Sequence, residues 1–370
     1  MSTTSTSKAR QRIEALLDEN SFVEIGALVS ARATDFNLKQ LDTPSDGVIT
    51  GYGVINDNLV YVYSQDASVM NGTIGEMHAK KIANLYDMAL KMGAPVIGLI
   101  DSAGLRLQEA TDALNAFGEI YMKQSLASGV IPQITAIFGT CGGGLAMIPT
   151  LTDFTFMEEK DAKLFVNAPN TLDGNSTAKC DTASAKFQSE EAGIVDGIGS
   201  EDEVIAKIRD LLTYLPNNNE DDDSYCECTD DLNRVCAGIE GANGDTSILI
   251  SNIADNAAFF EIKPDYAKDV VCGFIRMNGQ TVGVVANRAE IIGEDGKAAE
   301  KFEGMSAQGC EKAASMVDFC DSFNIPVVTF TNVKGYKATM CQEKMLAKAT
   351  AKLIYAFTNA TVPKINVIVG

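Results

Sequence analysis

Residues 130–139 read VIPQITAIFG, and residues 361–370 read TVPKINVIVG. Both stretches are apolar and strand-like, and the second lies 231 positions after the first (361 − 130). The same offset relates residues 94–97 (APVI) to residues 325–328 (IPVV). Sequence elements that recur at one fixed offset are typical of a duplicated structural unit. The sequence therefore predicts two tandem copies of one fold.

Each copy begins with a predicted β-hairpin. Residues 51–64 (GYGVINDNLVYVYS) match residues 273–286 (GFIRMNGQTVGVVA), and in both segments two strand-like runs flank an Asn-containing turn. Helical patterns follow at residues 77–92 and 310–323, each before one of the apolar strands. This order of elements predicts an α/β fold whose sheet starts with antiparallel pairing, rather than a purely doubly wound sheet.

An acidic linker separates the two predicted copies. Residues 216–224 (PNNNEDDDS) are polar and lack any hydrophobic periodicity. The predicted N-terminal domain spans residues 1–215, the linker residues 216–235 and the C-terminal domain residues 236–370. Copy one continues about 75 residues past Gly139, whereas copy two stops at Gly370. We therefore expect the second domain to be incomplete and the chain to be a fragment.

The composition is that of a globular protein, since 46% of the 370 residues are hydrophobic and 22% are charged. No apolar run reaches about 18 residues, and residues 1–20 lack the apolar core of a signal peptide, so no membrane span or leader is expected. The net charge of −20 disfavours general binding to nucleic acid or to anionic membranes. The nine cysteines follow no disulfide spacing, which indicates reduced thiols in the cytoplasm.

Metal-ligating residues are sparse in this sequence. Cys226, Cys228 and Cys236 form the one cysteine cluster, and no fourth ligand stands at zinc spacing, so no bound metal is expected. His78 is the single histidine of the chain, which excludes a site with two histidines. A lone histidine close to Glu76 is more typical of a structural hydrogen-bond partner than of a catalytic base.

The strongest local signal is residues 138–154 (FGTCGGGLAMIPTLTDF). An apolar strand runs into Gly142, Gly143 and Gly144, and a helix-compatible stretch follows. Exposed amide N–H groups at such a turn can bind a phosphate or the oxyanion of a thioester enolate. No Gly-Lys-Ser/Thr follows, which excludes a P-loop. Spacing alone leaves one alternative open, a glycine turn needed only for close packing.

A second signal, residues 100–110 (IDSAGLRLQEA), lies at the carboxyl end of a predicted strand, where open α/β sheets bind ligands. Gly104 can supply another amide donor, and Arg106 can pair with a phosphate or carboxylate. The alternative is a helix start capped by Asp101 or Ser102. Glycines where a base would be expected suggest that backbone amides act on the substrate and that a cofactor brings the proton acceptor.

Five segments together are similar to the carboxyltransferase subunit of biotin-dependent acyl-CoA carboxylases and decarboxylases. They are residues 46–82, 94–110 and 127–144 in copy one, and residues 259–287 (FFEIKPDYAKDVVCGFIRMNGQTVGVVAN) and 319–330 (FCDSFNIPVVTF) in copy two. The resemblance covers almost the whole chain in order. It implies an α/β fold of two tandem crotonase-like (ββα superhelix) domains, of which the second is incomplete in this chain.

The resemblance implies transfer of a carboxyl group between carboxybiotin, carried on a separate protein, and a short acyl-CoA of the propionyl/methylmalonyl or acetyl/malonyl pair. The N-domain holds acyl-CoA, and the C-domain of a dimer partner receives carboxybiotin. The freed ureido group takes the α-proton, and the enolate attacks CO2. The implied partners are a biotin carboxyl carrier protein, a biotin carboxylase or a membrane decarboxylase subunit, and a second copy of the chain.

The resemblance also assigns site residues. The family's glycine pair falls on Gly143 and Gly144, whose amides would form the oxyanion hole. By analogy the amides of Gly104 and Leu105 line the same pocket. The expected substrate-binding residues are Ser102, Arg106 and Gly142.

Several departures from the family pattern leave two other functions open. Ala103-Gly104-Leu105 replaces Gly-Gly-Ala, residues 172–198 lack the usual histidine, Val333-Lys334-Gly335-Tyr336 replaces Val-Pro-Gly-Phe, and residues around 294–309 are an insertion. Because the changes concentrate in the biotin half, a non-catalytic CoA-binding or scaffold subunit is one alternative. The other is a crotonase-type hydratase or hydrolase that uses Glu76 or Glu109 as acid or base.

Overall fold

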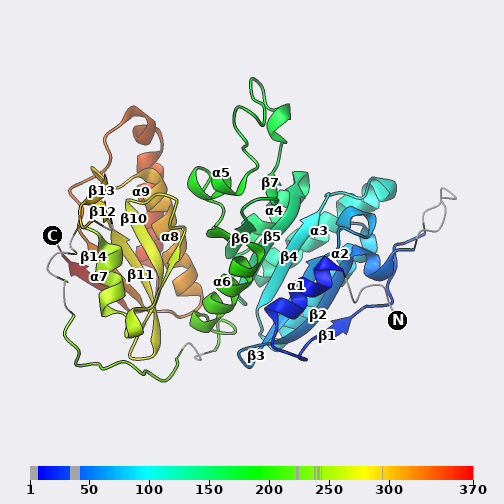
Figure 1. The fold of residues 1–370 in the computed structure, drawn as a ribbon, viewed down its shortest axis with the longest axis horizontal. Helices are drawn as coiled ribbons and strands as arrows, with labels where there is room; N and C mark the ends of the chain where they lie inside the picture. The colour runs from blue at the N-terminus through cyan, green and yellow to red at the C-terminus, as the bar shows by residue number, and fades with distance from the viewer. Residues whose placement is uncertain are drawn as a thin grey trace. The chain divides into compact units, whose positions relative to one another are not determined.

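The computed structural model describes residues 7–33, 42–221, 225–236, 239, 242, 244–293 and 295–369. The chain divides into two compact units, Met1–Thr213 and Tyr214–Gly370, which we call unit 1 and unit 2 (Figure 1). The division lies two residues before the end of the predicted N-terminal domain. Within the predicted linker, residues 222–224 lie outside the described residues, whereas Tyr225 pairs with Gln280 of unit 2.

Unit 1 is built on an eight-stranded sheet with the strand order β1-β2-β3-β4-β5-β6-β8, and β7 also pairs with β5. Its first three strands are antiparallel, and the pairs from β3 to β8 are parallel. The elements are α1 (Lys8–Leu16), β1 (Val23–Ile25), β2 (Val48–Ile55), β3 (Asn58–Gln65), α2 (Glu76–Met92), β4 (Val96–Ser102), α3 (Ala110–Ala127), β5 (Gln133–Gly142), α4 (Met147–Leu151), β6 (Phe154–Glu158), β7 (Lys163–Phe165), α5 (Ala185–Glu190), β8 (Gly197–Gly199) and α6 (Glu201–Tyr214).

The sequence explains why the middle of this sheet is parallel and buried. Strand β4 (VIGLIDS) and the first six residues of β5 are buried almost throughout. Parallel strands buried on both faces read as continuous apolar runs, because helices must cover both faces of the sheet. Helices α2 and α3 supply buried apolar side chains that pack into one core cluster with the strands.

Unit 2 repeats the first part of this arrangement, with the strand order β9-β10-β11-β14-β15. The hairpin strands are antiparallel, and the pairs β11–β14 and β14–β15 are parallel. Its elements are α7 (Thr246–Ile253), β9 (Phe259–Ile262), β10 (Val270–Met277), β11 (Gln280–Asn287), β12 (Glu290–Ile292), β13 (Ala298–Lys301), α8 (Ala307–Ser322), β14 (Val327–Thr331), α9 (Met340–Asn359) and β15 (Lys364–Ile368).

The strand registers confirm the duplication. Val96 pairs with Gln133 in unit 1, and Val327 pairs with Lys364 in unit 2, so both partners shift by 231 positions (327 − 96 and 364 − 133). The hairpins agree in the same way, with a shift of 222 positions (270 − 48). The predicted order of hairpin, helix, strand, helix and strand is therefore confirmed in both units.

A buried lysine recurs at the same place in the two units. Lys81 of α2 donates from Nζ to the carbonyls of Ser45 and Val48. Lys312 of α8, 231 positions later (312 − 81), donates to three carbonyl oxygens at 2.7–2.9 Å, including that of Val270. Val48 and Val270 are the first residues of β2 and β10. Each lysine thus ties the helix to the turn before the hairpin.

The insertion expected around residues 294–309 forms a small β-ribbon. Strands β12 and β13 pair antiparallel with an irregular register, and α8 begins at Ala307 within the expected stretch. Glu294 lies outside the described residues.

Candidate functional site

Two of the predicted loops meet at the carboxyl end of the unit 1 sheet. The register of β4 and β5 places Ser102 opposite Cys141, so the end of β4 adjoins the start of the glycine turn. A Cβ atom added at Gly104 would lie 3.4 Å from the carbonyl oxygen of Gly142. The structure therefore brings residues 102–106 and 142–144 together at the edge of the sheet where α/β folds bind ligands.

The glycine turn leaves open space above its backbone. Strand β5 ends at Gly142, which pairs with Phe165 of β7, and a side chain at Gly142 would come within 2.7 Å of the Phe165 ring. Gly143 has φ +64° and begins the short 3-10 helix η5 (Gly143–Ala146). Apart from its chain neighbours and the backbone of its own helical turn, no described atom lies within 4 Å of a Cβ added at Gly143. The first N–H groups of a helical turn have no partner within the turn, so these amides can serve as donors.

Tyr121 of α3 supports this turn and was not singled out in the sequence. Its hydroxyl donates to the carbonyl oxygen of Gly144. A tyrosine in the middle of an amphipathic helix carries no local sequence signal for this contact, because the glycine turn lies 23 positions away. The hydrogen bond orients the Gly144 peptide group within the turn.

The β4 loop is held by its own polar groups and by Ile74. Gly104 donates its N–H to Ser102 Oγ at 3.1 Å, and the Gly104 carbonyl accepts from Ile74 N–H at 2.8 Å. Arg106 N–H in turn donates to the Ile74 carbonyl at 3.0 Å. In this parallel bridge the N–H of the middle residue, Leu105, points away from Ile74. Of the two predicted amide donors in this loop, the geometry favours Leu105, because Gly104 N–H is used inside the loop.

Arg106 lies inside the protein, with 1% of its side chain exposed. Its Nη1 is 2.6 Å from Asp46 Oδ1 and 2.9 Å from Glu109 Oε1, and Nη2 donates to the Thr73 carbonyl at 2.6 Å. The predicted contact of Arg106 with a ligand phosphate stays untested, and this geometry favours a structural use of its charge. Ser102 is likewise buried, with its hydroxyl turned to Gly104.

The two candidate acid–base residues are also engaged. Glu109 Oε2 accepts from the N–H of Glu76 at 2.6 Å, which stabilises the start of α2. Glu76 pairs with Lys80 and Arg32, and these hydrogen bonds lower the pKa of its carboxyl group. Both carboxyl groups are thus already paired with cationic side chains or a backbone N–H group of unit 1.

His78 is a structural residue, as the sequence indicated. It is fully buried, with Nδ1 3.0 Å from the Asp46 carbonyl oxygen and Nε2 3.2 Å from Gln65 Nε2. Burial lowers the pKa of His78 to about 3, with a further contribution from the nearby Arg106 charge. The imidazole is therefore neutral at physiological pH.

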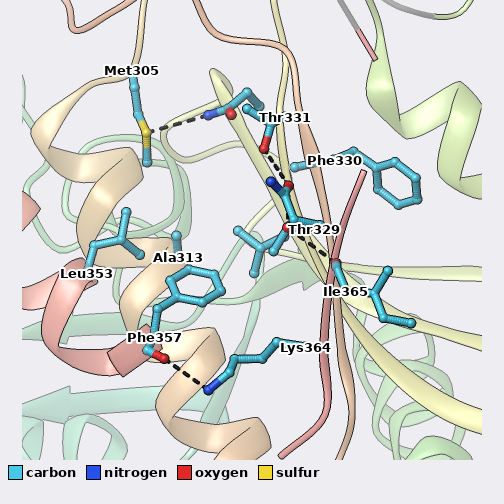
Figure 2. A pocket seen from close by; sticks show the side chains of 13 residues that line it. Met305, Ala313, Thr329, Phe330, Thr331, Leu353, Phe357, Lys364 and Ile365 are labelled. Carbon is cyan, nitrogen blue, oxygen red and sulfur yellow. Dashed lines mark hydrogen bonds between the residues drawn. The ribbon is translucent and has the colours of Figure 1, made fainter. Parts of the chain in front are cut away.

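Two cavities of unit 2 adjoin its central strands β11 and β14. One of about 360 Å³ lies between the sheet and helices α8 and α9, and Figure 2 shows Leu353 and Phe357 facing Thr329 and Ile365 across it. The other, of about 490 Å³, lies at the carboxyl ends of β11 and β14. Its lining includes Asn287, Arg288, Phe302, Met305 and Asn332.

No three His, Cys, Asp or Glu side chains are placed to share a metal ion in the part of the chain that the structure describes. Of the cysteine cluster, Cys226 donates its N–H to the Gly279 carbonyl, and Cys236 Sγ is 3.2 Å from the Asn252 carbonyl oxygen. The helices among the described residues are each too short or too polar to cross a membrane.

The carboxyl transferase domain family model matches residues 5–370 of this chain. The α-subunit of methylmalonyl-CoA decarboxylase from Propionigenium modestum is 38% identical over 97% of this chain and 70% of that protein. The mitochondrial propionyl-CoA carboxylase β-chain of Homo sapiens is 38% identical over 97% of this chain and 68% of its own length.

A solved structure agrees with these relatives. The crystal structure of transcarboxylase 12S, a hexamer assembly with methylmalonyl-coenzyme A and methylmalonic acid bound, superimposes with a TM-score of 0.89. It is 34% identical and is matched over 97% of this chain and 71% of that chain.

Proposed function

The chain belongs to the carboxyl transferase family of biotin-dependent acyl-CoA carboxylases and decarboxylases, and on that basis we propose that unit 1 binds a short acyl-CoA and stabilises its enolate through backbone amides. The observation that carries the proposal is the meeting of the β4 loop with the glycine turn, beside open space at Gly143. The proposed substrates are propionyl/methylmalonyl-CoA or acetyl/malonyl-CoA.

The residues of unit 1 have separate roles in this reaction. The N–H groups of Gly143, Gly144 and Leu105 face the thioester oxygen, where negative charge develops as the α-proton leaves. Donors fixed in advance stabilise this charge without having to reorganise during the reaction. Gly142 lets the backbone approach the acyl group closely. Ser102 sets the turn that presents Leu105, because its hydroxyl accepts from Gly104.

Biotin, carried on a separate protein, supplies the carboxyl group and the base that accepts the α-proton. The cavity of about 490 Å³ in unit 2 is the candidate for this group. Six charged residues line it (Asp269, Arg288, Glu290, Lys301, Glu303 and Lys334), and beside them it has the ring of Phe302, the thioether of Met305 and the amide side chains of Asn287 and Asn332. A neutral bicyclic urea needs both apolar contact and amide hydrogen bonds. We propose that this cavity receives it.

The proposed partners follow from the same function: a biotin carboxyl carrier protein, a biotin carboxylase or a membrane decarboxylase subunit, and at least one further copy of this chain. The nine cysteines are free thiols, and four of them are buried, which supports a reducing compartment such as the cytoplasm.

The test is carboxyl transfer from labelled methylmalonyl-CoA or malonyl-CoA to a purified biotin carrier protein. The matched variants are Gly144→Pro, which removes one amide donor, and Gly144→Ala, which keeps it. We expect Gly144→Pro to lower kcat/KM about 10²–10³-fold and Gly144→Ala to have a clearly smaller effect. Calorimetry with propionyl-CoA and circular dichroism then establish that the variants bind and fold. Equal activity of Gly144→Pro and the parent protein would contradict the oxyanion role.

One observation favours a second candidate, a non-catalytic scaffold subunit. In unit 2 the loop after β14, residues 333–341, is exposed throughout, in contrast to the loop after β4 in unit 1. Acyl-CoA binding without any carboxyl transfer to the carrier would support that alternative.

A further inference from the structure

Arg106 joins three separate segments beneath the β4 loop. It contacts Asp46 in the 3-10 turn η2 (Pro44–Gly47), Thr73 in the segment before α2, and Glu109 in η4 (Leu107–Glu109). Asp46 and Glu109 are as buried as Arg106, with 0% and 3% of their side chains exposed. A buried charge left without a partner is strongly unfavourable, so these three side chains hold one another in place.

The backbone on both sides of this network has positive φ angles, which residues other than glycine rarely adopt. Ser45 and Asp46 have φ of 56° and 49°, and Ala110, directly after Glu109, has φ 44°. Positive φ costs about 1–3 kcal/mol for such residues, and it persists only where the surroundings impose it. Lys81 contacts the same turn through the Ser45 carbonyl at 2.9 Å. The network therefore holds a strained backbone next to the proposed oxyanion loop.

Unit 2 provides an internal control, because it keeps the backbone bridge and has no acidic partner at the matching positions to form the ion network. Met305 N–H donates to the Gly335 carbonyl at 3.0 Å, and Lys337 N–H donates to the Met305 carbonyl at 3.0 Å, as Ile74, Gly104 and Arg106 do in unit 1. The positions that match Arg106, Asp46 and Glu109 hold Lys337, Lys268 and Met340 (337 − 106 and 340 − 109 are both 231; 268 − 46 is 222). The bridge can thus form without the ion network.

We infer that Arg106, Asp46 and Glu109 form a positioning network that fixes the direction of the Leu105 N–H for the acyl-CoA enolate in unit 1. The inference rests on the proposed function. Arg106 is a positioning residue, because its guanidinium is buried. Its backbone forms the end of the β4 loop, and it acts on the substrate through that loop. The network holds the loop after β4 in place as part of the oxyanion site, whereas the matching loop after β14 in unit 2 is exposed.

The test compares Arg106→Met, Arg106→Lys and Glu109→Gln with Arg209→Met, a control that breaks the ion pair of Arg209 with Asp18 elsewhere in unit 1. Hydrogen exchange by mass spectrometry follows the amides of Ile74 and Arg106, with the β2–β3 hairpin as internal reference. At short exchange times, before the hairpin amides exchange in either protein, we expect exchange at the loop to rise about tenfold in Arg106→Met and to rise less in Arg106→Lys and Glu109→Gln.

Steady-state carboxyl transfer supplies the second readout. Misplacement of a catalytic group by about 1 Å costs about 100-fold in rate, so we expect kcat to fall to that extent in Arg106→Met while KM for the acyl-CoA changes by less than about threefold. Arg106→Lys should recover part of kcat, and Arg209→Met should leave both values unchanged.

The two readouts separate the possible failures. Faster loop exchange with unchanged kcat, or equal exchange in loop and hairpin, would overturn the positioning role. A parent protein that binds acyl-CoA and transfers no carboxyl group would overturn the proposed function instead. In that case loop-specific exchange would still show that the network fixes the loop, and its absence would overturn the network as well.

Discussion

Units 1 and 2 share a backbone plan and differ in where they bury charge. Both have a hairpin, two parallel strands and two helices in the same register. Unit 1 places Arg106, Asp46 and Glu109 in its interior next to the loop after β4. Unit 2 has Lys337 and Met340 at the matching loop positions, and both are exposed. The same topology thus supports a rigid loop in one half and an open loop in the other.

The last strand of each repeat shows a second difference. In unit 1, the first six residues of β5 are buried, and Gln124 of α3 donates to the carbonyl of Ile148 in α4, which closes the space beside the strand. In unit 2, all five residues of β15 are exposed, and the cavity of about 360 Å³ lies at the corresponding place between α9 and the sheet. Strands β6 and β7, which pair with β5, and helix α4 together complete the core around β5.

The largest loss of stability is expected from Arg106→Met in unit 1. Removal of the guanidinium leaves Asp46 and Glu109 buried without their partner, which we expect to lower the free energy of unfolding of unit 1 by about 3–5 kcal/mol. The buried thiols of Cys141 in unit 1 and Cys320 in unit 2 report each half separately when labelled in increasing urea. A shift confined to Cys141 would support the prediction, and equal shifts at both thiols would contradict it.

A second prediction concerns the buried lysine that the two units share. Lys81→Met and Lys312→Met each leave buried carbonyl groups without a donor, so each should lower the free energy of unfolding of its own unit by about 2–3 kcal/mol. Burial lowers the pKa of Lys81 to about 8, so Lys81 remains mainly protonated at pH 7, and burial also lowers the pKa of Lys312. The same two-thiol labelling measures this effect. A large loss in only one unit would break the structural equivalence of the two lysines.

The third prediction concerns the effect of low pH on the free energy of unfolding of unit 1, through His78. His78 is neutral when folded, with a pKa of about 3, whereas an unfolded histidine has a pKa near 6.5, so the unfolded chain binds more protons between these values. Stability from this group is therefore present above about pH 6.5 and is lost as the pH falls toward 3. Between pH 7 and pH 5 the expected loss from His78 alone is about 2 kcal/mol. Burial raises the pKa of Asp153, also in unit 1, to about 7, and this group acts in the opposite direction over the same range.

The position that matches His78 in unit 2 is Gly309 (309 − 78 is 231), which cannot titrate. The His78 contribution should therefore make Cys141 labelling easier at pH 5 than at pH 7 in the parent protein when it is compared with a His78→Gln variant, with Cys320 labelling as reference and after correction for the pH dependence of the thiol reaction. His78→Gln should remove this contribution. An unchanged pH dependence in this variant would show that other groups in unit 1 cause it.

The fold was largely predictable from the sequence, because the duplication determines the order of elements and the apolar runs determine which strands are central. The predicted helices 77–92 and 310–323 correspond to α2 (Glu76–Met92) and α8 (Ala307–Ser322). The order and type of the elements depend on periodicity and chain order, which a single sequence contains. That the glycine turn and the β4 loop line one pocket was implied by the family resemblance.

The contacts that orient the loops were not predictable. Asp46 lies 60 positions before Arg106, and no local pattern reveals that they pair. Nor does any sequence pattern indicate that Gly104 N–H turns back to Ser102 and that Leu105 N–H points outward. The direction of an amide depends on the backbone dihedrals of the loop, and these depend on tertiary contacts.

The smallest predicted effect provides the counterpart to Arg106→Met. Lys337 occupies the matching position in unit 2, and its side chain is exposed, so its charge is solvated in the folded and unfolded states alike. We expect Lys337→Met to change the free energy of unfolding of unit 2 by no more than about 0.5 kcal/mol, measured by Cys320 labelling in urea. A loss close to that of Arg106→Met would mean that both loops depend on a buried charge, and the contrast between the rigid and the open half would no longer hold.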